Sequence, residues 1–218
     1  MIKPNKKGFK HKLSLKKSIL IILVVLFLDQ ALKVWIKLHL TIGEEIPMLG
    51  NWFNLYFTEN NGMAFGMQFG GEWGKLSLSI FRILAISAIF VYLIILDKRK
   101  ANQGLIFAVS MIFAGALGNI IDSVFYGLVF TQSSYHTLAE MVPFGTGYSS
   151  ILHGKVVDML YFPLINLHQA DAPSWIPSFF FGYDDHLIFF RPIFNIADSA
   201  ITIGVSWLLL FERKNLKL

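Results

Sequence analysis

The fold class of this chain is decided by residues 18–38, whose sequence is SILIILVVLFLDQALKVWIKL. A helix needs about 20 residues to cross the hydrocarbon core of a bilayer, and this run has that length. Lysine residues precede this run, as they precede the apolar region of a signal peptide. The run is too long for one, carries Asp29, Lys33 and Lys37 in its second half, and is followed by no small-residue cleavage site. We therefore interpret it as a retained transmembrane helix.

Three further runs have the length and apolar character of membrane spans, at about Leu76–Leu96, Gly104–Tyr126 and Ile193–Phe211. Of the 218 residues, 55% are apolar and 15% are charged, whereas an ordinary soluble domain has about 25% charged residues. The chain has no Cys, which excludes a disulfide framework, a thiol nucleophile and a Cys-ligated metal. The sequence thus predicts an all-α membrane protein with four transmembrane helices in a single domain, residues 18–211.

Basic residues gather beside these runs and predict the topology. Short loops rich in Lys and Arg stay on the cytoplasmic side. With four spans, the tail 1–17, the loop 97–104 and the tail 212–218 all fall on that side, so both termini are expected in the cytoplasm. The formal charge of +5 is then a topology signal, because seven of the 19 Lys and Arg residues precede the first span. We expect no nucleic-acid partner.

The two long connections, at about 39–75 and 127–192, face outward in this topology. Residues 46–69 mix apolar, aromatic and turn residues, which predicts strands interrupted at Asn60-Asn61-Gly62 and a small extracytoplasmic β-cradle. The second connection is rich in Phe and Trp among prolines and glycines. Both have the composition of aromatic platforms at the membrane interface. The sequence leaves open whether they only anchor the protein or also contact a substrate.

Ionisable residues in or near a span are informative, because a charge in hydrocarbon is costly unless it is paired or hydrated. Asp29 and Lys33 lie four residues apart on one helix face and can form a pair. Either the pair snorkels toward the outer interface, or its face borders a polar cavity that holds a lipid headgroup. Asn119 and Asp122, three apart beside small residues of the third run, favour a supporting role in helix packing.

Asp158 and Asp198 are better placed for chemistry. Asp158 lies in an apolar outer segment, and Asp198 lies at the outer start of the fourth run, where Pro192 suits the first helical position and places Asn195 and Asp198 on one face. Two carboxylates that meet in a poorly hydrated pocket tend to share one proton. Such a dyad activates a water and protonates a leaving amide nitrogen without metal or cofactor. Asp198 alone could instead serve as a helix-dipole partner.

Other catalytic designs fit the sequence less well. It contains no G-x-S-x-G elbow and no H-E-x-x-H pair, and its six His residues lack metal-ligand spacing. Pairing of Ser199 with Lys33 or Lys155 is conceivable but leaves the carboxylates unexplained. A small proton- or ion-coupled carrier, with Asp29, Lys33, Asp122 and Asp198 as a charge relay, is the alternative from another class. Carriers often show internal repeats and broken helices, and neither is visible here.

Five strings along the chain resemble the motifs of the lipoprotein signal peptidase (signal peptidase II) family. They are DQALK (29–33), TENNGMAFG (58–66), GNIID (118–122), VVD (156–158) and FNIADSAI (194–201). Each string alone is weak. Their order and their places in a four-span chain make the resemblance specific, and it covers most of the chain.

The resemblance implies an aspartic endopeptidase of the bacterial inner membrane that cleaves prolipoproteins before a diacylglyceryl-modified cysteine, at the outer face. It implies Asp158 and Asp198 as the catalytic pair and Asn195 as the residue that orients them. It also implies inhibition by globomycin-type antibiotics, contact with membrane phospholipid, and no metal or cofactor; we expect a monomer. The supporting residues implied are Asp29, Lys33, Asn60, Gly62, Asn119 and Asp122.

Two features depart from the family pattern. The family usually has Arg after the third-motif Asp, whereas this chain has Ser123, so Asp122 needs another partner, with Lys33 and Arg191 as candidates. The segments 123–157 and 159–192 are longer than is typical. Extra outer loops are therefore expected to reshape the entrance to the site.

Overall fold

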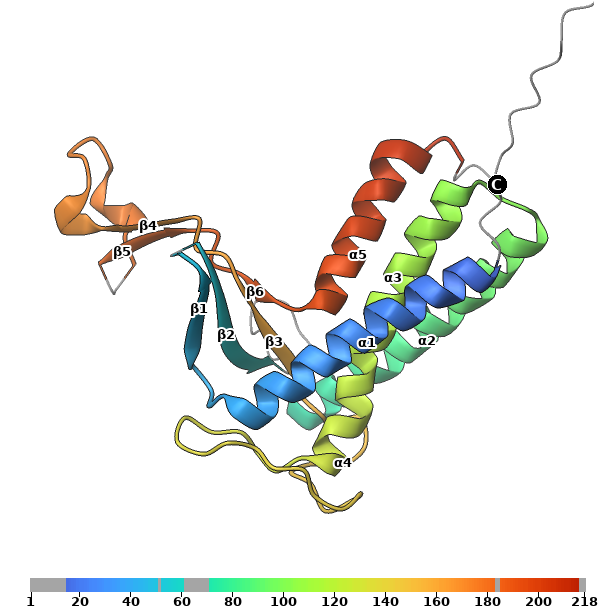
Figure 1. Ribbon diagram of the computed structural model, residues 1–218, viewed down its shortest axis with the longest axis horizontal. Coiled ribbons are helices and arrows are strands. Elements are labelled where there is room, and N and C mark those ends of the chain that lie inside the picture. Colours follow the sequence, from blue (N-terminus) through green and yellow to red (C-terminus); the bar gives the residue numbers. More distant parts are fainter. Residues whose placement is uncertain (1–14, 51, 61–70, 183–184, 216–218) are drawn as a thin grey trace, which may run out of the picture.

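The computed structural model describes residues 15–50, 52–60, 71–182 and 185–215. Its long helices are α1 (Leu15–His39), α2 (Gly71–Lys98) and α3 (Gln103–Ile121). The π-turn η2 (Asp122–Tyr126) and the short α4 (Gly127–Val129) continue α3. The last helix, α5 (Ile196–Trp207), continues as the π-turn η5 (Leu208–Glu212). Figure 1 shows these helices as a bundle, and α3 contacts α1, α2 and α5.

Three helices of the described part are long and apolar enough to cross a membrane, at Lys16–His39, Trp73–Lys98 and Gln103–Val129. They match three of the four predicted spans. Their outward faces expose large apolar side chains such as Phe27 and Phe81, as lipid-facing helices do. The chain is therefore a multi-pass membrane protein.

The fourth predicted span differs from its expected form. Ile193 and Phe194 form the strand β6, and the α-helix starts at Ile196 and has 12 residues before its π-turn. The prediction that Pro192 takes the first helical position is wrong. Asn195 caps the helix instead, because its side chain accepts a hydrogen bond from the Asp198 amide and frees the preceding residues to pair as a strand.

A sheet sits at one end of the bundle. It has four strands in the order β1 (Glu45–Leu49), β2 (Phe53–Asn60), β3 (Val156–Tyr161) and β6, all antiparallel. A separate two-stranded sheet pairs β4 (Ile165–His168) with β5 (His186–Phe189). The strands of the first connection agree with the sequence prediction. The strands of the second connection were not predicted, so the protein is helix-rich with some sheet rather than all-α.

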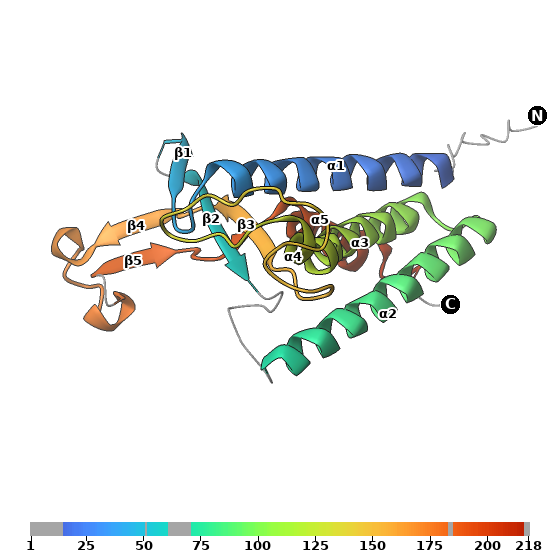
Figure 2. The ribbon, with the colours of Figure 1, turned by 90° about the horizontal axis from the view of Figure 1, so that it is seen from below.

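An apolar core joins the sheet to the bundle. Ile36 in the last turn of α1 and Leu40 directly after it pack with Phe57 of β2, Met159 of β3 and Phe130, and all five are buried. Figures 1 and 2 show that the start of α1, the α2–α3 connection and the end of α5 lie at the opposite end of the bundle from the sheet. This packing fixes β2 and β3 across the end of the helices.

Helices α3 and α5 approach closely because glycine lies at two of their contacts. A Cβ atom on Gly115 would collide with the carbonyl oxygen of Ala197, and one on Gly204 would lie 2.6 Å from the carbonyl oxygen of Ala108. Backbone oxygens cannot move aside as a flexible side chain can. The close contact therefore depends on the missing side chains, as is common between membrane helices.

We expect Gly115→Ala to lower the free energy of unfolding by about 1–3 kcal/mol, the usual cost of overpacking, because the added methyl pushes α5 away from α3. Denaturant unfolding in detergent micelles measures the change. Ala88→Val is the matched control, since Ala88 is exposed on α2 and the added volume meets no neighbouring helix. Equal stability of Gly115→Ala and wild type would contradict the close packing of α3 and α5.

Candidate active site

Asn195 lies at the centre of the candidate site and contacts both predicted catalytic carboxylates. Its side-chain amide nitrogen donates to Asp158 Oδ1 at 2.7 Å. Its side-chain oxygen accepts from the Asp198 backbone N–H at 2.8 Å, and its own backbone N–H donates to Asp198 Oδ2 at 3.3 Å. The capping box that starts α5 therefore also joins Asp158 on β3 to Asp198 on α5.

Amide side chains hold the remaining carboxylate oxygens. Asn60, at the end of β2, donates to Asp158 Oδ2, and Asn119 of α3 donates to Asp198 Oδ1 at 2.7 Å. Each carboxylate thus accepts N–H groups on both of its oxygens. This fixes the directions of the two acids before any substrate arrives.

The environments of the two acids differ. Asp158 is buried, whereas Asp198 is half-buried. Burial and, second to it, the nearby charge of Asp198 together raise the pKa of Asp158 to about 7, against smaller opposing effects of Lys33 and Asn195. An acid with this pKa is close to half protonated at neutral pH. Asp158 therefore has the pKa of an acid that takes up and releases a proton near neutral pH.

A buried cluster of charges lies beside the dyad. Lys33 Nζ is 2.9 Å from Asp29 Oδ2 and 2.8 Å from Asp122 Oδ2, and all three side chains are fully buried. The predicted pairing of Asp29 with Lys33 is present, but the pair lies inside the bundle, so the snorkelling interpretation is wrong. Of the two candidate partners of Asp122, Lys33 is the cation that contacts it.

This cluster is connected to the dyad and to the backbone around it. Lys33 donates to Asn119 Oδ1 at 2.9 Å, and the same oxygen accepts from the Asn195 side chain at 3.0 Å. Asp29 Oδ1 accepts the N–H of Ala197 at 2.8 Å, in the first turn of α5. The cluster therefore ties α1 and α3 to the helix start that carries Asp198.

Two residues of this network were missed in the sequence. The Gln30 side chain donates to Asp122 Oδ1 at 2.9 Å and to the Gly118 carbonyl at 3.2 Å, and Tyr126 donates to Gln30 Oε1 at 3.1 Å. Gln30 stands inside the DQALK string, directly beside Asp29. Its position next to an acid inside an apolar span was the signal in the sequence that could have identified Gln30 as part of the network.

A second buried ion pair, also not predicted as part of the site, holds the strand that carries Asn60. Lys37 of α1 binds the Glu59 carboxylate and donates to Ser133 Oγ at 2.7 Å. Its ammonium also lies 5.4 Å from the Phe130 ring centre and 5.2 Å from that of Tyr148. Because Glu59 precedes Asn60 in β2, this pair fixes the end of the strand next to Asp158.

The remaining predictions from the sequence concern a Ser–Lys pair, Gly62 and metal ligands. Ser199 Oγ donates to the Asn195 carbonyl at 2.9 Å, and Lys33 is occupied by two carboxylates, so a Ser199–Lys33 pair is not formed. Gly62 lies outside the described residues. Within the described residues, no three His, Asp or Glu side chains are grouped as metal ligands.

Bundle, sheet and site together define a multi-pass membrane protein with a polar, asparagine-linked carboxylate pair at one end of its helices. A family model described as signal peptidase (SPase) II matches residues 21–213. The chain belongs to this family of aspartic peptidases, and the resemblance seen in its five motifs is confirmed.

Individual relatives agree with this assignment. The chain is 42% identical over 190 residues to a lipoprotein signal peptidase of Porphyromonas gingivalis, covering 87% of this chain and 79% of the relative. It is 38% identical over 200 residues to one of Amoebophilus asiaticus, covering 90% and 78%. A bacterial membrane enzyme solved by the in meso method has a similar structure, with a TM-score of 0.58, 30% identity, and coverage of 93% of this chain and 94% of that chain.

We expect Lys33→Met to lower the free energy of unfolding by about 3–5 kcal/mol, because it leaves Asp29 and Asp122 as buried charges without their cation. Denaturant unfolding in detergent measures the loss. Lys98→Met, at an exposed position in the last turn of α2, is the matched control and should change stability by less than about 1 kcal/mol. Similar stability of the two variants would show that the buried cluster does not hold the fold.

Proposed function

We propose that this protein removes signal peptides from diacylglyceryl-modified prolipoproteins, cleaving before the lipidated cysteine with Asp158, Asp198 and an activated water. Membership of the signal peptidase II family supports the substrate class. The observation that carries the mechanism is the bridge through Asn195, which orients a buried and a half-buried carboxylate from two different elements.

The different environments of the two acids suggest their roles. Asp198, the more exposed acid, accepts a proton from the attacking water, whose oxygen bonds to the scissile carbonyl carbon. Asp158, whose pKa is raised to about 7, holds the proton that passes to the leaving amide nitrogen. Cleavage then leaves a carboxyl group on the signal peptide and an amino group on the cysteine. The pair still holds one proton, the one that Asp198 took from the attacking water, and its transfer to Asp158 restores the starting state.

The place of the site suits a substrate that lies partly in the bilayer. Asp198 is in the first turn of α5, at the end of the bundle that carries the sheet. A diacylglyceryl cysteine holds its scissile bond near the membrane surface. A dyad at this depth reaches that bond without drawing the lipid out of the membrane.

We place the sheet end outside and the opposite end in the cytoplasm, with α5 and η5 as a fourth crossing of the inner membrane. The α2–α3 connection and the end of η5 lie at the end opposite to the sheet, and their basic residues support this orientation: Lys98, Arg99, Lys100, Arg213 and Lys214. Both termini are then cytoplasmic. The active form proposed is a monomer in contact with phospholipid.

In this proposal the supporting residues hold the two catalytic carboxylates in place and take no part in proton transfer. Asn60 and Asn119 direct the two carboxylates, and Asp29, Lys33 and Asp122 hold the helix that carries Asp198. A globomycin-type cyclic peptide is expected to compete with substrate for the dyad. A closed, buried ion cluster favours this static role over the charge relay of a carrier.

We expect Asp158→Asn and Asp198→Asn each to slow cleavage at least about 100-fold, because each removes one partner of the acid–base pair. Conversion of a purified diacylglyceryl prolipoprotein in detergent, followed as a gel shift, measures the rate. Asp171→Asn, an exposed position far from the dyad, is the matched control and should cleave at the wild-type rate. Normal cleavage by either dyad variant in a folded protein would refute the mechanism.

The pH profile offers a second test. As the pH rises through about 7, Asp158 loses the proton that the leaving nitrogen requires, so kcat should fall by up to tenfold per pH unit above that value. Single-turnover cleavage between pH 5.5 and 9, with the fold monitored at each pH, measures this. A rate that stays constant to pH 9 would exclude Asp158 as the general acid.

A further inference from the structure

The β4–β5 hairpin and the loop at its end form an arm, described here as residues 163–182 and 185–190, that projects from the four-stranded sheet. Its two strands pair only with one another among the strands of the described chain. An isolated two-stranded sheet is marginally stable in water and needs a surface to pack on. The polarity of its faces and its position indicate which surface covers the arm.

The two faces of the arm differ in polarity. Side chains alternate between the faces of a strand, and directly paired residues share a face. The pairs Ile165–Phe189 and Leu167–Leu187 therefore make one wholly apolar face. The pair His168–His186 lies on the other face, together with the pair Asn166–Ile188, and the His186 ring contacts Asn166 Oδ1 at 2.7 Å.

The polar face borders an open cavity, whereas the apolar face is exposed at its root. Asn166 and Ile188 line a cavity of about 760 Å³ together with Asn54 and Glu45 of the main sheet. On the apolar face, Ile165 and Phe189 expose more than half of their surface. The polar face is thus turned toward this cavity, whereas on the apolar face Ile165 and Phe189 stay exposed and Leu167 and Leu187 are half-buried.

The outer end of the arm adds large aromatic side chains. Trp175 is 78% exposed and Phe179 is 77% exposed, and Phe180 beside them is also exposed. Trp is enriched at membrane interfaces, and Trp and Phe are typical of the apolar face of segments that lie at the boundary between headgroups and acyl chains. Residues 163–190 contain no Lys or Arg, so any attraction to a surface here is apolar rather than ionic.

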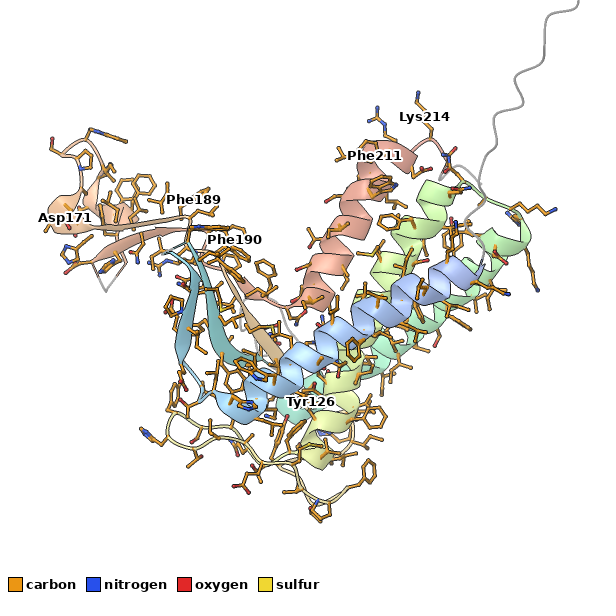
Figure 3. The ribbon with its side chains drawn as sticks, in the orientation of Figure 1. Tyr126, Asp171, Phe189, Phe190, Phe211 and Lys214 are labelled. Carbon is orange, nitrogen blue, oxygen red and sulfur yellow. The ribbon has the colours of Figure 1, made fainter. Side chains whose placement is uncertain are left out.

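The position of the arm relative to the helices indicates what covers it. Figures 1 and 2 show the arm extending from the sheet beyond the end of the bundle, and in Figure 1 it leaves the sheet on the side on which α5 lies. In Figure 3, Asp171 marks its free end, and Phe189 lies on the side of the arm turned toward α5. The helices that cross the bilayer set the level of the lipid, so the apolar face meets the bilayer surface beside α5.

We propose that the β4–β5 arm lies on the outer leaflet of the membrane, with Ile165, Leu167, Leu187 and Phe189 against lipid and Trp175 and Phe179 inserted among the headgroups. The apolar surface of the bundle then continues along the arm. A chain of ring contacts supports this continuity, because Phe53 stacks on Phe162 at 4.6 Å, Phe162 contacts Phe194, and Phe194 contacts Phe190 at the root of the arm.

The natural lack of cysteine makes the test direct, because one introduced thiol takes a spin label at a unique site. Ile165→Cys places the label on the apolar face, and His168→Cys, the matched control, places it on the polar face of the same strand. The full chain is reconstituted in phosphatidylcholine vesicles. Collision of each label with oxygen, which concentrates in lipid, and with a water-soluble nickel chelate is measured by electron paramagnetic resonance.

The label at 165 should collide mainly with oxygen and the label at 168 mainly with nickel, giving oxygen-to-nickel ratios that differ several-fold. The ratio at 165 should not rise when anionic lipid is added, because the arm carries no Lys or Arg. Nickel-dominated collisions at both sites would place the arm in water and overturn the proposal. Protection of the label at 165 from both reagents would mean that protein, such as a second copy of this chain, covers the face, and would equally overturn it.

Discussion

The structure depends on one buried cation. Lys33 lies in the interior of the bundle with no exposed surface, where an unpaired ammonium would be costly, and it is neutralised by Asp29 and Asp122. These acids belong to α1 and to the π-turn after α3, and Asp29 also accepts the first-turn amide of Ala197 in α5. The contacts that neutralise Lys33 thus hold α1, α3 and α5 together next to the candidate site.

The charge cluster around Lys33 also determines the geometry of the candidate site. Lys33 donates to Asn119, whose side chain in turn contacts Asn195 and Asp198. The acids that we propose as catalytic are therefore held by neutral amides, and the hydrogen bonds of the lysine reach them through Asn119. Amides fix the direction of a carboxylate without neutralising it, so Asp158 keeps the raised pKa that burial imposes.

Much of the fold could be predicted from the sequence, because long apolar runs and basic flanks are local properties. The three long helices, the strands before Asn60 and the Asp29–Lys33 contact all follow from periodicity or length. The exact start of α5 did not follow, because an Asn-x-x-Asp capping box and a proline at the first turn are both good helix starts. The strand β6 pairs with β3, a distant segment, and that pairing decided between them.

The sequence by itself determined which residue types are present, that the chain enters a membrane and, through five ordered motifs, to which family it belongs. It also singled out Asp158 and Asp198 as candidates. Only the tertiary structure decided that Asn195 joins them, that Lys33 rather than Arg191 meets Asp122, and that Lys37 and Gln30 belong to the networks beside the site. Such contacts join segments far apart in the chain, and no local pattern records them because burial and proximity arise only when the helices and strands pack.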